Sequence, residues 1–271
     1  DYVASRRRPA LPALDSILRP GNSLVSAAEW AAVRGAMPPA LLEKVNPFTW
    51  SDEFPAEMAR GGFDAIVGNP PYIRIQTMMA YSSEEATYYQ DAGSPYRTAR
   101  QDNFDKYALF VERALALLRP TGRLGVIVPH KFMTIQAGRA LRELIAGSGG
   151  LEQVVHFGVQ QVFGRQASNY TCLLILDRGR RDMVRVERVE ALEAWRYGVP
   201  GQVTTVPVDD LGADAWQFAD TATRDLFARV RRACPAELGQ VAEIFVGVQT
   251  SADGIYIFSA AAEAEAAVTL R

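Results

Sequence analysis

A short apolar run that ends in two prolines constrains the fold of this chain more than any other feature. Residues 63–67 follow a pair of glycines and are followed by Gly68, Asn69, Pro70 and Pro71. An apolar run bounded by turn residues on both sides predicts a buried strand that ends abruptly. Because consecutive prolines have no N–H to donate to a neighbouring strand, the chain is expected to leave the sheet here.

Helical and strand patterns alternate after this run. Apolar side chains recur at spacings of three and four from Phe104 to Leu118, which predicts an amphipathic helix packed on a core. A second helix is expected at 135–146, and strands are expected at 125–128, 154–155, 171–176 and 183–189. This order predicts an α/β fold with a partial doubly wound, Rossmann-like sheet. The last two strands follow one another closely, so they are expected to form an antiparallel hairpin at one edge.

Three other segments carry local predictions. A helix is expected around 26–33, and the polar, tyrosine-rich residues 74–101 are interpreted as a mobile loop with one short helix. The glycine-rich residues 147–150 follow a helix and precede a strand. A phosphate-binding loop opens a helix instead, so residues 147–150 are interpreted as a helix stop.

The pattern of residue types changes after residue 190. Turn-forming residues become frequent, and a helical pattern returns near 219–232. We therefore expect residues 1–190 to form the C-terminal part of one domain and residues 191–235 to connect it to the next. Residues 236–271 would then begin a second domain.

Composition excludes several classes of protein. The 271 residues include 29 basic and 31 acidic residues, for a net charge of −2, and 48% are hydrophobic, which is typical of a folded chain. Only Cys172 and Cys234 are present, too few for a disulfide framework or a cysteine zinc site. His130 and His156 have no metal-like spacing, so no metal is expected. No apolar run approaches the roughly 18–20 residues that span a bilayer. A cytoplasmic protein without membrane contact is expected.

The candidate catalytic residues are Asn69, Pro70, Pro71 and Tyr72, which directly follow the predicted strand. In open parallel sheets, ligands bind beyond the carboxyl ends of the strands. The prolines present carbonyl oxygens without N–H donors, and Asn69 adds a side-chain acceptor. Such converging acceptors suit a planar substrate that bears an amino group and packs against the Tyr72 ring. The alternative interpretation is that Asn69, Pro70 and Pro71 form a simple turn with no role in binding or catalysis.

Residues 63–72 resemble the catalytic motif of N6-adenine DNA methyltransferases. The similarity is greatest to the long restriction–modification and phage-exclusion type, in which methyltransferase and target-recognition domains share one chain. Residues 21–24 resemble the segment that lies near the adenine ring of the methyl donor in that family. Residues 105–113 resemble the helix after the catalytic loop, with Lys106 where an apolar residue is more usual, and residues 125–132 resemble the next strand and its exit.

This resemblance implies transfer of a methyl group from S-adenosylmethionine to N6 of an adenine flipped out of double-stranded DNA. By the same resemblance, Asn69 and the Pro70 carbonyl hold the amine, and Tyr72 and Phe163 lie on either side of the base. Base–aromatic stacking contributes about 1–3 kcal/mol per base, comparable to the few kcal/mol that extruding a base requires. Asn22 and Asn69 would contact the donor.

One expected motif is missing from the sequence. The family's glycine-rich donor-binding loop is not found, and it is expected upstream of Asp1 in the parent protein. Residues 245–253 resemble the opening of a target-recognition domain. Two alternatives remain open: a protein-glutamine N5-methyltransferase, which uses the same tetrapeptide, and a non-catalytic DNA-binding or structural fragment.

Overall fold

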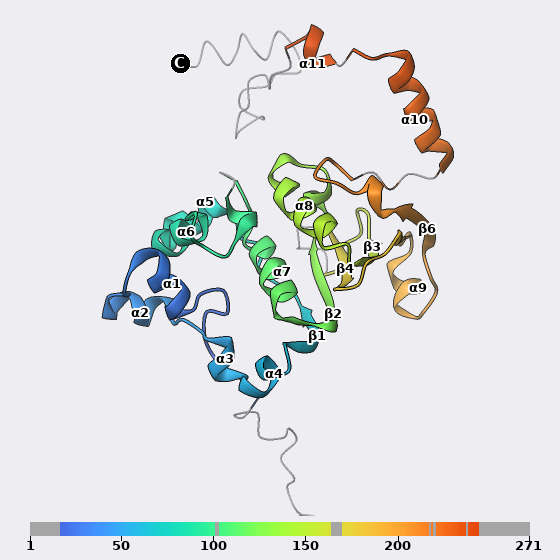
Figure 1. Cartoon of the computed structure of the whole chain (residues 1–271). Coiled ribbons are helices and arrows are strands. Elements are labelled where there is room, and N and C mark those ends of the chain that lie inside the picture. Colours follow the sequence, from blue (N-terminus) through green and yellow to red (C-terminus); the bar gives the residue numbers. More distant parts are fainter. Residues whose placement is uncertain are drawn as a thin grey trace, which may run out of the picture. The chain divides into compact units, whose positions relative to one another are not determined.

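A computed structural model gives the arrangement of most of the chain (Figure 1). It describes residues 17–100, 103–163, 170–216, 218, 221–236 and 238–243. The chain divides into two compact units, residues 1–218 and 219–271. The second unit contains α10 (Thr221–Ala233) and α11 (Leu238–Val241). Among the described helices, none is long and apolar enough to cross a membrane.

One mixed sheet organises the first unit. Its strands are β1 (Phe63–Gly68), β2 (Leu118–Pro129), β3 (Leu151–His156), β4 (Thr171–Asp177), β5 (Met183–Arg188) and β6 (Gln202–Pro207). They lie in the order β1-β2-β4-β3-β5-β6. The pairs β1–β2 and β3–β5 are parallel, and the other neighbouring pairs are antiparallel. The strands β1, β2, β3 and β5 therefore end at the same edge of the sheet, and the predicted α/β, Rossmann-like class is confirmed.

The predicted hairpin between residues 171–176 and 183–189 is wrong. β3 lies between β4 and β5, and the antiparallel pair at that edge is β5 with β6. The connection after β4 crosses the start of β3, where the Asp177 N–H donates to the Gly150 carbonyl at 2.9 Å. A Cβ at Gly150 would lie 1.9 Å from the Asp177 carbonyl oxygen, so the glycine allows the crossing. The glycine turn therefore permits a strand order that strand spacing alone did not predict.

Helices cover the sheet and form a second cluster beside it. They are α1 (Ala27–Arg34), α2 (Pro39–Val45), α3 (Trp50–Glu53), α4 (Pro55–Ala59), α5 (Ile75–Tyr81), α6 (Ser83–Gln90), α7 (Lys106–Leu117), α8 (Arg139–Ser148) and α9 (Leu192–Arg196). Short 3₁₀ turns occur at Arg97–Ala99, His130–Met133, Gln136–Gly138 and Val208–Asp210. The expected helix at 26–33 is confirmed as α1, whose first turn is capped by the Ser26 hydroxyl. The expected helix stop is also confirmed, because α8 ends at Ser148 and is capped by Gly149 in the left-handed conformation, with φ 67°.

Helix α7 packs between two hydrophobic clusters. Tyr107 and Val111 belong to the cluster that also contains the sheet core. Leu109 belongs to the other cluster, which is formed with α1, α5 and α6. Because α7 contributes to both clusters, it fixes the sheet relative to the helices on its other side (Figure 1).

Residues 74–101 were expected to be a mobile loop with one short helix, and for the described residues 74–100 this expectation is wrong. They form α5, α6 and a 3₁₀ turn, and the side chains of Tyr88, Tyr89 and Tyr96 are buried within them. The rings of Trp30 and Tyr88 stack with centroids 4.9 Å apart. Tyrosine supplies a large apolar ring despite its polar hydroxyl, which explains how a polar-looking segment forms a core.

The sheet unit continues beyond residue 190. β6 pairs with β5, and Leu211 and Trp216 are buried in the sheet core. Residues 202–216 are therefore more than a connecting segment. The assignment of residues 1–190 and 236–271 to two domains remains a prediction, and most of 236–271 lies outside the described residues.

Candidate active site

Strand β1 begins and ends at positions that its sequence determines. Gly62, with φ 120°, lies directly before β1, and a Cβ there would lie 2.2 Å from the Leu117 carbonyl oxygen. β1 then ends at Gly68, and only Asn69 separates it from the two prolines. The expectation of a buried strand is wrong, since Val67 is 88% exposed. The reason is that β1 pairs only with β2 among the described residues, so it lies at an edge of the described sheet.

The loop after β1 is held by the segment that precedes α7. Asn69 and Pro71 are exposed, Pro70 is buried and Tyr72 is partly buried. The Lys106 N–H donates to the Ile73 carbonyl at 2.7 Å, and the Ile75 N–H donates to the Phe104 carbonyl at 3.0 Å. These two backbone bonds fix the end of the loop.

The Tyr72 side chain is held at both its ring and its hydroxyl. The hydroxyl donates to the Ile127 carbonyl of β2 at 3.1 Å. Its ring meets the Tyr107 ring of α7 at 85°, with centroids 6.1 Å apart. The pKa of Tyr72 is raised to about 12, mainly because the side chain is partly buried and to a smaller extent because Cys172 lies nearby. Tyr72 is therefore a neutral, oriented aromatic residue near neutral pH.

A cavity of about 300 Å³ lies beside this loop. Asn69, Pro70 and Pro71 line it together with Ser23. The described lining residues also include aromatic and aliphatic side chains of β1, α3 and α7, among them Trp50, Phe63, Phe110, Ala114 and Leu117. The structure thus brings to one cavity the predicted catalytic loop and Ser23, which belongs to the predicted donor segment 21–24.

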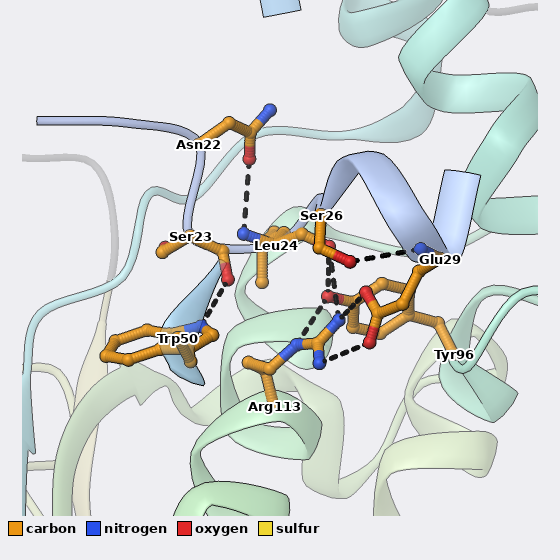
Figure 2. A network of polar contacts seen from close by, with 8 residues as sticks. All are labelled: Asn22, Ser23, Leu24, Ser26, Glu29, Trp50, Tyr96 and Arg113. Atoms are coloured by element: carbon orange, nitrogen blue, oxygen red, sulfur yellow. Dashed lines mark hydrogen bonds and ion pairs between the residues drawn. The ribbon is translucent and has the colours of Figure 1, made fainter. Parts of the chain in front are cut away.

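Asn22 lies next to this cavity wall rather than on it. Its side-chain oxygen accepts the Leu24 N–H at 3.2 Å (Figure 2). Its amide nitrogen donates to the Glu85 carboxylate. Glu85 also accepts a hydrogen bond from the Lys106 ammonium at 2.7 Å. The two charged side chains are 7% and 13% exposed, so a nearly buried ion pair orients the Asn22 amide.

Phe163 lies beyond the end of β3, and its side chain is 50% exposed. β1 and β3 end at the same edge of the sheet, so Phe163 and Asn69 both follow strands at that edge. The roles of Tyr72 and Phe163 in stacking on a base remain a prediction. Residues 164–169, which follow Phe163, are outside the described residues.

The two histidines also lie at this edge. The rings of His130 and His156 stack with centroids 4.5 Å apart, and Tyr170 stacks on His130 at 6.0 Å. Burial lowers the pKa of both histidines, and lowers that of His156 to about 4. Within the described part of the chain, no group of three His, Cys, Asp or Glu side chains could hold a metal ion.

Sequence reasoning missed the contribution of α7 to the cavity. Phe110, Arg113 and Ala114 line it, and all three lie on one helix face. The spacing of Phe110, Ala114 and Leu117 follows a helical period, which was a usable signal. Trp50 was missed because nothing local indicates that α3 approaches residue 23.

Comparison with known proteins identifies the family. The family model described as Eco57I restriction-modification methylase matches residues 26–163, about half of the chain. The type II restriction enzyme and methyltransferase RM.Eco57I of Escherichia coli is 30% identical over 254 residues, covering 92% of this chain and 23% of that protein. The chain belongs to the Eco57I restriction-modification methylase family. The type II methyltransferase M.XhoI of Xanthomonas vasicola is 26% identical over 216 residues, covering 72% of this chain and 37% of that protein.

The family assignment confirms the resemblance to restriction–modification methyltransferases. The Eco57I match includes the Asn69–Tyr72 loop, α7 and Phe163, and begins after Asn22. The structure of the type IIG restriction endonuclease BpuSI aligns with a TM-score of 0.43 at 15% identity, over 76% of this chain and 27% of that one. The chain described here spans well under half the length of the two curated relatives, RM.Eco57I and M.XhoI.

Proposed function

We propose that this chain forms the adenine-binding part of a DNA methyltransferase in a restriction–modification or phage-defence system. It would transfer a methyl group from S-adenosylmethionine to N6 of an adenine extruded from double-stranded DNA. One observation carries the proposal: Asn69, Pro70 and Pro71 border the same cavity as Ser23, at the carboxyl end of a strand. Membership of the Eco57I family supports the same assignment.

The chain's own residues would hold the base and its amine. The Asn69 Oδ1 atom and the Pro70 carbonyl would each accept one N–H of the exocyclic amine, which favours the pyramidal nitrogen that develops during attack. Pro70 and Pro71 have no N–H, so neither competes for the nitrogen lone pair. Tyr72 and Phe163 would stack on the two faces of the base.

The cavity fits the adenosyl end of the donor. About 300 Å³ lies at the lower end of small-molecule sites, which span roughly 300–1,000 Å³. Phe110 and Trp50 provide aromatic surface for a planar ring. When bound, S-adenosylmethionine supplies a methyl carbon that accepts the electron pair of the amine nitrogen as its bond to sulfur breaks. Asn69 and the Pro70 carbonyl would then hold the newly acidic N–H until its proton passes to water.

A product assay tests this function. The full-length protein is supplied with methyl-labelled S-adenosylmethionine and offered unmethylated duplex DNA and a release-factor-like protein side by side. We expect the label in DNA, as N6-methyladenine after digestion. Label in a protein glutamine would instead support the alternative methyltransferase. Absence of label, together with DNA binding, would support the non-catalytic alternative.

A further inference from the structure

The Arg113 side chain connects α7 to the beginning of α1. Its two terminal nitrogens, Nη1 and Nη2, donate to the two carboxylate oxygens of Glu29 at 2.9 and 2.6 Å (Figure 2). The Arg113 side chain is 15% exposed. Burial acts to lower the pKa of Arg113, but the bonds to Glu29 and Tyr96 outweigh it and raise the pKa. The guanidinium is therefore a permanent, paired cation beside the cavity.

The same guanidinium orients a buried tyrosine. The Arg113 Nε atom donates to the Tyr96 hydroxyl at 2.9 Å, and that hydroxyl donates to the Leu24 carbonyl at 2.5 Å. A second, longer bond of 3.4 Å joins Arg113 Nη2 to the Leu24 carbonyl. Because Arg113 can only donate, the Tyr96 hydroxyl proton must point to Leu24.

The preceding carbonyl is also held by a side chain. The Trp50 indole N–H donates to the Ser23 carbonyl at 3.0 Å. Two successive carbonyls, those of Ser23 and Leu24, thus bond to side chains from three other segments (Figure 2). Ser23 and Arg113 both line the 300 Å³ cavity beside Asn69. The network therefore fixes a wall of that cavity that is not part of a helix or of the sheet.

We propose that Tyr96 and Arg113 are positioning residues that set the affinity for the methyl donor by holding the Ser23–Leu24 backbone in its binding conformation. This inference rests on the proposed function. An irregular wall that moves must be ordered when the donor binds, which weakens binding. A wall already ordered by buried hydrogen bonds avoids that cost.

If the network only stabilised the fold, removing any buried hydroxyl of this cluster should affect donor affinity equally. Tyr88 provides the matched control for Tyr96. Tyr88 and Tyr96 are both fully or almost fully buried in the same cluster. The Tyr88 hydroxyl has no hydrogen-bond partner among the described residues. Tyr88→Phe and Tyr96→Phe each remove one buried hydroxyl, but only Tyr96→Phe removes a hydrogen bond to the Leu24 carbonyl and leaves the longer bond from Arg113 alone.

The experiment uses the full-length protein and measures donor affinity by calorimetry, kcat and KM for the donor, DNA affinity and thermal unfolding. Tyr96→Phe should raise the Kd and KM for S-adenosylmethionine about threefold to tenfold, the scale of one hydrogen bond. The kcat at saturating donor and the Kd for DNA should stay unchanged. Tyr88→Phe should leave donor affinity unchanged. Arg113→Lys, which keeps the charge but loses the fork geometry, should raise the donor Kd as well.

Three outcomes would overturn the inference. The first is an unchanged donor Kd in Tyr96→Phe or in Arg113→Lys. The second is an equal loss of donor affinity in Tyr88→Phe and Tyr96→Phe, which would indicate a general effect of stability. The third is a wild-type protein that does not bind the donor, which would overturn the proposed function first and this inference with it.

Discussion

The hydroxyl of Tyr72 donates a hydrogen bond to the main-chain carbonyl of Ile127, at 3.1 Å, and so attaches the Asn69–Tyr72 loop to the neighbouring strand β2. The Tyr107 ring packs against Tyr72 edge-on. With its hydroxyl and its ring both held, the Tyr72 side chain has a fixed orientation, which the proposed stacking on a base would use. An aromatic platform that is already oriented needs no ordering when a base stacks on it.

Removing the hydroxyl and removing the ring should therefore have different effects. Tyr72→Phe keeps the stacking surface and should slow methyl transfer only about twofold to tenfold, as expected for one hydrogen bond. Tyr72→Ala also removes stacking and should cost a further 1–3 kcal/mol or so of base binding. Single-turnover methylation and the fluorescence of 2-aminopurine at the target position measure the two effects. Equal losses in both variants would argue against stacking by Tyr72.

The nearly buried ion pair between Lys106 and Glu85 should contribute more to the free energy of unfolding than the exposed pair between Lys44 and Glu84. Lys106→Met leaves the Glu85 carboxylate nearly buried and unpaired, which should lower the free energy of unfolding by about 3–5 kcal/mol. The control is Lys44→Met, since the Lys44–Glu84 pair is 47% and 45% exposed and should contribute at most about 1 kcal/mol. Denaturant unfolding measures both. Similar losses in the two variants would contradict the prediction, and Glu85→Gln should partly rescue Lys106→Met.

Two glycines at the end of α8 should respond in opposite directions to alanine. Gly147 lies within the helix, and an added Cβ would have nothing within 4 Å. Gly147→Ala should therefore stabilise the protein by about 0.5–1 kcal/mol. Gly149 has φ +67°, so Gly149→Ala should destabilise it by about 1–2 kcal/mol. Thermal unfolding of both variants gives the signs, and stabilisation by Gly149→Ala would exclude its role as the helix stop.

His156 should make the protein less stable as the pH falls below neutrality. In the folded protein the pKa of His156 is lowered from 6.5 to about 4, mainly by burial and further by the positive charges of His130 and Arg188. Between pH 6.5 and 4 the unfolded chain takes up a proton that the folded chain does not, so the free energy of unfolding decreases. His156→Gln should make this decrease shallower. Identical slopes for wild type and variant in denaturant unfolding at several pH values would contradict the assignment.

Local signals predicted the parts of the fold that depend on neighbouring residues. The helix expected at 26–33, the strand that ends at Gly68 and the stop at Gly149 are each determined within a few residues. The Asn69–Tyr72 loop was found for the same reason, since a strand followed by two prolines leaves few conformations.

Long-range packing decided what the sequence did not predict. The insertion of β3 between β4 and β5 depends on a crossing over Gly150, and the exposure of Val67 depends on which strands flank β1. The Arg113–Glu29 pair joins residues 84 positions apart, with no pattern in the sequence that links them. The buried tyrosines of α6 were misread because their polarity was counted and the packing of their rings was not.

The most direct test of the central claim is the single-turnover rate of methyl transfer by the full-length protein with Asn69→Ala, at saturating donor and DNA. If Asn69 holds the target amine through its side-chain oxygen, the rate should fall about 100-fold to 1,000-fold, as expected when a preorganised hydrogen-bonding group is removed. DNA affinity should remain close to that of the wild type. A rate within about threefold of wild type, the scale of a weak hydrogen bond, would contradict the claim.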